Sequence, residues 1–168
     1  MRTVFVIGTV GVGKTTTAAA LSDLLAQDGV VHAVIDIDET RRLRPPPVGD
    51  PFQLEVQLAN LAAMTANYWA AGAQIVIAAG VIESREDLDR CAEAVGGPVS
   101  VVRLTAEAGE IGSRLDGRHA DDPDGLEWHA HRAVELDRIL DAAALAEVLV
   151  DTTKRTPHEV AQAIRAML

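Results

Sequence analysis

A glycine-rich stretch near the N-terminus holds the residues best suited to chemistry. Its letters follow the spacing G-x-x-x-x-G-K-T from Gly8 to Thr15. An apolar run (4–7) precedes it and an Ala- and Leu-rich stretch (16–26) follows it, so the loop should join a buried strand to a helix. In such a P-loop, backbone N–H groups and the helix N-terminus converge on phosphate oxygens. We predict that a nucleoside triphosphate binds at Gly8, Val10, Gly11, Val12, Gly13, Lys14, Thr15 and Thr16.

Two side chains of this loop have distinct expected roles. Lys14 should reach the β- and γ-phosphates and stabilise charge in the transition state, which makes it a catalytic candidate. The Thr15 hydroxyl should contact Mg²⁺. The alternative is an ordinary glycine-rich turn with one exposed lysine, and the strand–loop–helix context disfavours it.

Two carboxylates end the second apolar run, Val34-Ile35-Asp36-Ile37-Asp38. Strand residues two apart share a face, so both should point to the edge of the sheet where ligands bind. The third run (74–79) ends without an acid, so we assign Asp36 to Mg²⁺ beside Thr15. Asp38 is the candidate general base, although the pattern alone does not decide which aspartate is the base. The alternative is that Asp38 only caps a turn.

Strand and helix patterns alternate along the whole chain. An Arg/Pro loop (39–50) and a polar Gly/Asp/Pro segment (116–125) interrupt them. Near-continuous apolar strands predict an α/β fold of three layers, with a five-stranded parallel sheet, in one domain spanning 1–168. The expected strands are 3–7, 31–36, 74–79, 99–104 and 147–150, and the expected helices are 14–28, 51–71, 84–95, 106–115, 126–145 and 157–168.

The composition narrows the functional classes. The chain has 168 residues, one cysteine and a formal net charge of −10. A single cysteine excludes an internal disulfide, and the acidic balance disfavours nucleic acid as the main partner. The N-terminus has no charged leader, so we expect no signal peptide and a cytoplasmic location. The uncharged stretch from Val56 to Ile82 is interrupted by amides and Gly72, so we do not expect it to enter a membrane.

The D-x-D and the arginines after it, Asp36 to Arg42, resemble the small-metabolite kinases of the shikimate kinase, gluconate kinase and adenylylsulfate kinase group. Three further segments agree: 79–81 after the third strand, 114–119 as the start of a lid, and 151–157 as the loop that flanks adenine. The resemblance implies a P-loop NTPase fold with a small lid at about 116–125, and ATP-dependent transfer of the γ-phosphoryl group to a small-molecule hydroxyl, with Mg²⁺. It implies roles in nucleotide binding for Arg114, Arg155 and Pro157, in catalysis for Arg118, and in substrate binding for Gly80, Arg41 and Asp38.

The acceptor itself is not named by these motifs. Shikimate kinase would show three glycines where this chain has Gly80 alone, and the Tyr-Glu-x-Pro element of adenylylsulfate kinase is absent. Arg41 or Arg42 would orient an anionic acceptor, and Arg132, beyond the lid, could touch phosphate or acceptor. Uncharged side chains recur at helical spacing along 51–71 and suit hydrogen bonds to hydroxyls, with a half-buried face or a homodimer contact as equal alternatives. They are Gln53, Gln57, Asn60, Met64 and Asn67, of which Asn60 is our candidate for substrate binding.

Other nucleotide-binding classes remain alternatives to this kinase hypothesis. A nucleoside or nucleotide kinase would need aromatic stacking, and only 3% of the residues are aromatic. A nucleotide-binding switch without an acceptor would hydrolyse ATP slowly and bind a partner protein. The guanine-reading motif Asn-Lys-x-Asp is missing, and we expect an AAA ATPase with an arginine finger to be larger.

Overall fold

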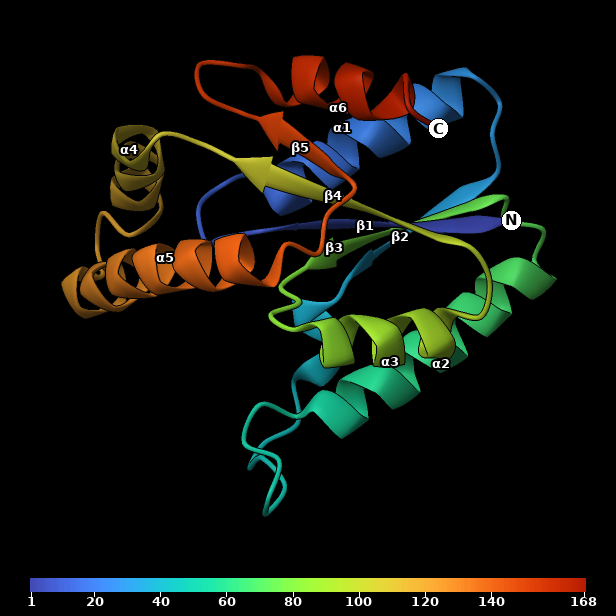
Figure 1. The fold of residues 1–168 in the computed structure, drawn as a ribbon, viewed down its shortest axis with the longest axis horizontal. Coiled ribbons are helices and arrows are strands. Elements are labelled where there is room, and N and C mark those ends of the chain that lie inside the picture. The colour runs from blue at the N-terminus through green and yellow to red at the C-terminus, as the bar shows by residue number, and fades with distance from the viewer.

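The computed structural model describes all 168 residues and is built around a five-stranded, all-parallel sheet. The strand order is β2-β3-β1-β4-β5, which places β1 at the centre between β3 and β4 (Figure 1). This arrangement confirms the predicted α/β P-loop architecture. The strands are β1 (Arg2–Gly8), β2 (His32–Asp36), β3 (Ile75–Gly80), β4 (Val99–Thr105) and β5 (Val148–Asp151).

Helices cover both faces of this sheet. In Figure 1, α1 and α6 lie on one face and α2 and α3 on the other, while α4 and α5 lie beyond the ends of β4 and β5. A single 3₁₀ turn, η1, follows β2. The bounds are α1 (Lys14–Gln27), η1 (Asp38–Arg41), α2 (Leu54–Ala70), α3 (Arg85–Val95), α4 (Ala108–Arg118), α5 (Pro123–Ala143) and α6 (Pro157–Arg165).

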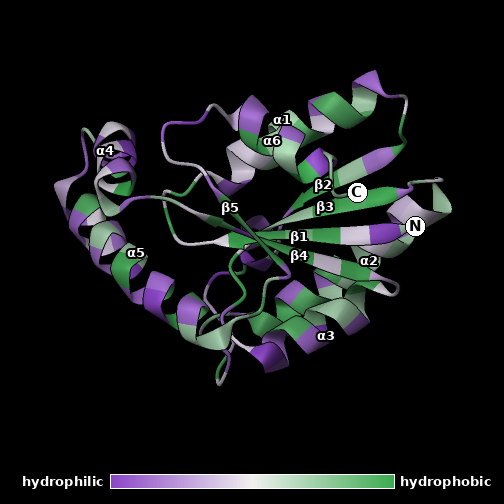
Figure 2. Ribbon diagram, turned by 45° about the horizontal axis from the view of Figure 1, so that its top comes forward, coloured by the Kyte–Doolittle hydropathy of each residue, from purple (hydrophilic) through white to green (hydrophobic).

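The central strand, β1, shows why residues 4–7 of the sequence are all apolar. Val4 and Val6 belong to the hydrophobic cluster under α1 and α6, while Phe5 and Ile7 belong to the cluster under α2 and α3. Successive strand side chains point to opposite faces, and all four are fully buried. The hydropathy colouring of Figure 2 shows the inner strands hydrophobic along most of their length and the helices with mixed colouring. The sheet is therefore buried on both faces, as its sequence predicts.

Three segments differ from the sequence-based expectation. The Arg/Pro loop begins with η1, and α2 starts at Leu54 rather than at 51. The segment 116–125 is not one loop, because α4 continues to Arg118 and α5 starts at Pro123. The Asp122 side chain accepts the Gly125 N–H and caps α5, an N-cap with proline in the first turn that the letters Asp-Pro do signal. No helix of the protein is both long and apolar enough to cross a membrane.

Candidate active site

A cleft of about 510 Å³ lies where β1 and β2 end. The phosphate loop forms its floor, and η1 and the segment after β3 form one wall. The end of α4 and the first half of α5 form the opposite wall. Many of the site residues predicted from the sequence line this cleft. They are Val10, Gly11, Gly13, Lys14, Thr15, Thr16, Asp36, Asp38, Arg41, Arg118 and Arg132.

The phosphate loop has the backbone geometry that its glycines predict. Gly13 precedes α1 with φ +100°, a conformation that costs glycine least. Gly8 ends β1, and Val12 is buried beneath the loop. The hydroxyl of Thr9 donates to the carbonyl of Ala133 in α5, at 2.6 Å. The loop is thereby tied directly to the wall that carries Arg132.

Lys14 is held inside this loop. Its Nζ donates to the Thr9 carbonyl at 3.0 Å. Burial lowers the pKa of Lys14 from its ordinary value, the carboxylates of Asp38 and Asp36 partly offset this, and nearby Arg118 lowers it further. Negative phosphate oxygens would favour the charged ammonium. Lys14 and Arg118 therefore mark the place in the cleft where negative charge is best stabilised.

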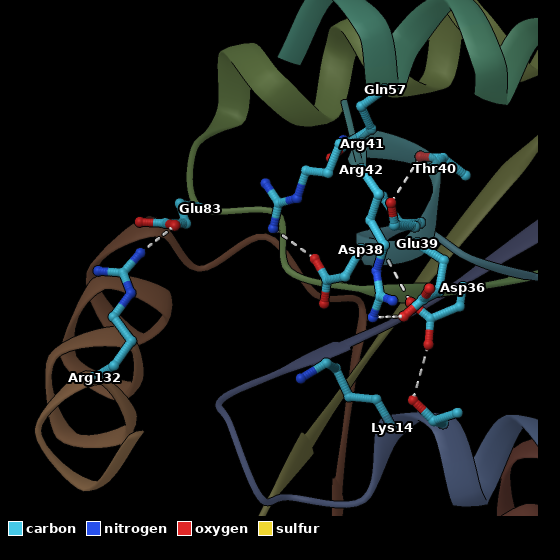
Figure 3. Close-up of polar contacts among 12 residues, drawn as sticks. Lys14, Asp36, Asp38, Glu39, Thr40, Arg41, Arg42, Gln57, Glu83 and Arg132 are labelled. Carbon is cyan, nitrogen blue, oxygen red and sulfur yellow. Dashed lines mark hydrogen bonds and ion pairs between the residues drawn. The ribbon is translucent and has the colours of Figure 1, made fainter. Parts of the chain in front are cut away.

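Asp36 and Thr15 form an oxygen pair at the phosphate loop, and Figure 3 shows Asp36 on the same side of the cleft as Lys14. The Thr15 hydroxyl donates to Oδ2 of Asp36 at 3.2 Å. A hydroxyl and a carboxylate are hard oxygen ligands, which Mg²⁺ prefers. The structure holds no group of three or more His, Cys, Asp or Glu side chains arranged to bind a metal, so a Mg²⁺ at this pair would need phosphate oxygens and water as its other ligands. The two residues fit a nucleotide-bound Mg²⁺ rather than an all-protein metal site.

Asp38 reaches the cleft by a route that strand alternation does not describe. β2 ends at Asp36, and Asp38 is the first residue of η1. Oδ1 of Asp36 accepts the backbone N–H of Asp38 at 3.0 Å, and η1 begins after Ile37 without a side-chain cap. The Asp38 carboxylate instead accepts from Arg41 at 2.6 Å. Both aspartates line the cleft as predicted, but the argument from a shared strand face was wrong.

Gly80 serves packing rather than substrate binding. It is the last residue of β3 and does not line the cleft. A Cβ built on Gly80 would lie 2.7 Å from the Cβ of Ile37, so only glycine lets β3 approach the segment between the two aspartates. The cleft is lined instead by Val81 and Glu83. The sequence therefore pointed to the end of β3, but the residues there that line the cleft are Val81 and Glu83 and not Gly80.

Asn60 also lies outside the cleft. Its amide donates to the Thr40 carbonyl at 2.7 Å and so holds η1 against α2. Two other amides of the predicted stripe are likewise used inside the protein. Gln57 is buried, with its amide near Cys91, and Gln53 accepts the Leu43 N–H. Of the three amides only Asn60 contacts the aspartate-bearing turn, and none of them lines the cleft.

Three residues predicted to bind nucleotide, the lid arginine Arg114 and the adenine-flanking Arg155 and Pro157, line a second hollow of about 230 Å³. Arg114 fixes its wall, donating to the carbonyls of Val12 at 3.1 Å and Thr152 at 2.9 Å. Arg155 and Pro157 line the same hollow, and the Arg155 guanidinium caps the backbone carbonyls of Asp151 and Glu159. Arg114 thus braces the phosphate loop itself.

Arg118 and Arg132 occupy different surroundings in the cleft. Arg118 is exposed at the end of α4 and has no salt-bridge partner in the structure, so it is free to meet phosphate. Arg132 pairs with Glu135 at 2.7 Å and with Glu83 across the cleft (Figure 3). Sequence reasoning missed Glu83. Its only signal was its place just after the third strand, where the ends of parallel strands gather ligand-binding groups.

Comparison with known proteins now places the chain in a family. Residues 4–138 match a family model described as an AAA domain, and the protein belongs to that family. No curated protein sequence matches the chain closely enough to count as a relative.

Solved structures share the fold along nearly the full chain. A tunicamycin resistance protein from Deinococcus radiodurans has a TM-score of 0.70 at 21% identity, covering 99% of this chain and 94% of its own. A gluconokinase from Sinorhizobium meliloti 1021 has a TM-score of 0.64 at 17% identity, with coverage of 98% and 90%. The APS kinase of Mycobacterium tuberculosis, in complex with AMPPNP and APS, has a TM-score of 0.64 at 19% identity, with coverage of 99% and 96%. The resemblance to small-metabolite kinases is confirmed at the level of the fold.

Proposed function

We propose that the protein is an ATP-dependent kinase that transfers the γ-phosphoryl group of ATP to a hydroxyl of a small molecule. One observation carries this proposal. The cleft continues past the phosphate loop and past the Asp36–Thr15 pair to a second carboxylate, Asp38, in the same hollow. A switch protein that only binds nucleotide has no need of a carboxylate there. The names of similar structures, a gluconokinase and an APS kinase, support the proposal.

In this reaction the acceptor oxygen attacks the γ-phosphorus, the bond from phosphorus to the β–γ bridging oxygen breaks, and ADP leaves. Asp38 takes the proton of the hydroxyl, and Arg41 orients the Asp38 carboxylate through the 2.6 Å contact. Lys14 and Arg118 stabilise the phosphoryl oxygens, because phosphoryl transfer depends mainly on positioning and charge neutralisation. Asp36 and Thr15 are the residues that would hold Mg²⁺, and the ion would supply charge neutralisation on the phosphates.

One feature favours a narrower version, a nucleoside kinase. Trp128 and His129 both line the cleft, and their rings meet edge to face with centroids 4.8 Å apart. Aromatic side chains of this kind could stack on a base. The low aromatic content of the sequence therefore understates what is present at the site itself.

The test is acceptor-dependent ATP consumption. Wild-type protein with ATP and Mg²⁺ should form ADP much faster when a pooled small-molecule cell extract is added. Asp38→Asn should lose that stimulation and keep ATP binding, while Asp89→Asn, a matched change on the exposed side of α3, should behave as wild type. A wild-type rate that ignores the extract would contradict the kinase proposal and favour a switch protein.

A further inference from the structure

The acceptor side of the cleft carries equal numbers of positive and negative side chains. Beyond the phosphate loop and Asp36, its wall holds three arginines and three carboxylates, apart from Arg118 at the end of α4. Each of these three arginines pairs with one of the three carboxylates, so the six side chains together have a formal charge of zero. The pairs are Arg41 with Asp38 at 2.6 Å, Arg42 with Glu39, and Arg132 with Glu83.

This pairing disfavours a charged acceptor. An anion would have to compete with a carboxylate already on each arginine, and Arg132 has a second one in Glu135. It would also approach the negative triphosphate. A cation would have to compete with the arginine that already pairs with each carboxylate. The expectation that Arg41 or Arg42 serves an anionic acceptor is therefore not supported by the contacts that these arginines make.

The same pairs suit hydroxyl groups. A guanidinium held by one carboxylate still has further N–H donors, and the carboxylate has a second oxygen that can accept. A hydroxyl both donates and accepts, so it can bridge such a pair without displacing either partner. Three pairs around one hollow offer this to several hydroxyls of one molecule.

Trp128 is the aromatic residue among the apolar side chains of the walls, which also include Val81 and Leu136. It is 61% exposed although it lines the cleft. Its ring makes an edge-to-face contact with the ring of His129. The His129 ring is in turn stacked on His119, with centroids 4.4 Å apart. The indole is thus supported from α5 and from the end of α4. An exposed, supported aromatic ring is a stacking surface for a flat or ring-shaped molecule.

We propose that the acceptor is an uncharged, hydroxylated ring compound that stacks on Trp128 and hydrogen-bonds to the three Arg–carboxylate pairs. This inference rests on the proposed kinase activity and names its substrate class. A sugar or glycoside and a nucleoside share this chemistry. Glu83, Arg132 and Trp128 are the residues that set the specificity.

The first experiment separates acceptors by charge. A small-molecule extract is passed over an anion exchanger and then a cation exchanger at neutral pH, and ATP consumption is measured with each fraction. We expect stimulation by the fraction retained on neither column, and loss of that stimulation after periodate cleaves vicinal diols. Stimulation only by a retained fraction would overturn the inference and leave the kinase proposal intact. Stimulation by no fraction would overturn both.

The second experiment tests the wall with the active neutral fraction as substrate, separated further into glycosides and nucleosides to tell these sources apart. Glu83→Gln should raise KM by about tenfold with kcat nearly unchanged, because one charged hydrogen-bond partner is lost. Trp128→Ala should raise KM about threefold to tenfold through lost stacking. Glu55→Gln, which breaks a carboxylate–arginine pair away from the cleft, is the matched control. Unchanged KM in both cleft variants would overturn the inference.

Discussion

Asp36 and Asp38 are two residues apart and have separate surroundings. Asp36 accepts the Thr15 hydroxyl on one oxygen and the Asp38 N–H on the other, so it joins the end of the phosphate loop to the start of η1. Asp38 contacts Arg41 and faces the acceptor side. From these contacts we expect Asp36 to serve the metal and Asp38 to take the proton. The first prediction separates the two roles.

Asp36→Asn should weaken the response to Mg²⁺ and recover part of its activity at high metal concentration, because losing a metal ligand is a binding defect. Asp38→Asn should keep the wild-type Mg²⁺ response and lose transfer to the acceptor, because the base is gone. A titration of acceptor-dependent ATP consumption against Mg²⁺ measures both. Identical Mg²⁺ curves for the two variants would contradict the assignment.

Gly80 should be sensitive to a single added methyl group. Gly80→Ala places its Cβ against Ile37 in the segment that joins the two aspartates. We expect a loss of about 1–3 kcal/mol in the free energy of unfolding, as for overpacked cores, together with a weakened Mg²⁺ response. Gly112→Ala is the control, since nothing lies within 4 Å of its added Cβ, and it should gain roughly 0.5–1 kcal/mol as an alanine within a helix. Urea unfolding of both variants decides, and equal stability for Gly80→Ala and wild type would refute the packing argument.

At the residue scale, sequence reasoning worked where the signal was local. The phosphate loop is contiguous, and its context of strand and helix could be read directly. Asn60 and Gly80 were misassigned because their partners, Thr40 and Ile37, are about 20 and 43 residues away and only the fold brings them together. Glu83 was missed because its partner Arg132 lies in α5. No spacing rule within one segment connects such pairs.

At the scale of elements, the wall formed by α4 and α5 is the part of the cleft that we expect to move when ATP binds. The predicted lid, 116–125, is reduced to a four-residue connection between Arg118 and Pro123. Glycines such as Gly117 and Gly125 favoured a loop. In the structure, however, α4 continues through Gly117, and α5, capped by Asp122, begins before Gly125. The arginine that should meet phosphate, Arg118, stands at the end of α4. Movement of this wall would bring Arg118 over the phosphates and exclude water.

ATP with Mg²⁺ should therefore slow hydrogen exchange in the backbone amides from 116 to 126. The reason is that closure adds contacts between Arg118 and the nucleotide. Amides of α3, which does not line the cleft, serve as the internal control and should slow much less than those at 116–126. Mass-spectrometric exchange with and without nucleotide measures this, and equal protection at 116–126 would argue against a lid.

The interface of α2 and α3 contains the only cysteine, and it gives a pH-dependent prediction. Burial, together with Asp87, raises the pKa of Cys91 from 9.0 to about 11. Between these two pH values the unfolded thiol loses its proton while the folded one keeps it, so the stabilising effect is present below pH 9 and is lost as pH rises toward 11. Wild type should lose up to about 2 kcal/mol more stability across this interval than Cys91→Ala does.

Urea unfolding of both proteins at several pH values tests this difference, because other titrating groups affect both proteins alike. Cys91→Ala should be less stable at neutral pH, since it leaves a small cavity. Parallel stability curves for wild type and Cys91→Ala would show that the thiol is not shielded as the structure indicates.

At the scale of the whole molecule, β1 connects the two halves of the core to the site. Its alternate residues belong to the clusters on the two sheet faces, and its last residue begins the phosphate loop. The net charge of −10 is not concentrated in the cleft. The prediction that nucleic acid is not a partner therefore depends on the acidic side chains of the outer surface.

Because β1 joins both parts of the core to the phosphate loop, a ligand that binds the loop should stabilise the entire fold.

The last prediction uses this linkage. ATP with Mg²⁺ at about one hundred times its Kd should stabilise the protein by about 2.7 kcal/mol, because the unfolded chain has no assembled phosphate loop to bind it. For a domain of this size that corresponds to a rise in Tm of roughly 5–10 °C.

Lys14→Ala should unfold near the wild-type Tm without nucleotide, lose most of the shift at the same ATP concentration, and lose turnover by orders of magnitude. Arg85→Ala, which removes one exposed charge on α3, should keep the full shift. A thermal-shift series over ATP concentration, with Mg²⁺ alone as the blank, measures both. If Lys14→Ala retained the wild-type shift, the nucleotide would bind somewhere other than the loop, and the assignment of Asp36, Asp38 and the acceptor wall would fall with it.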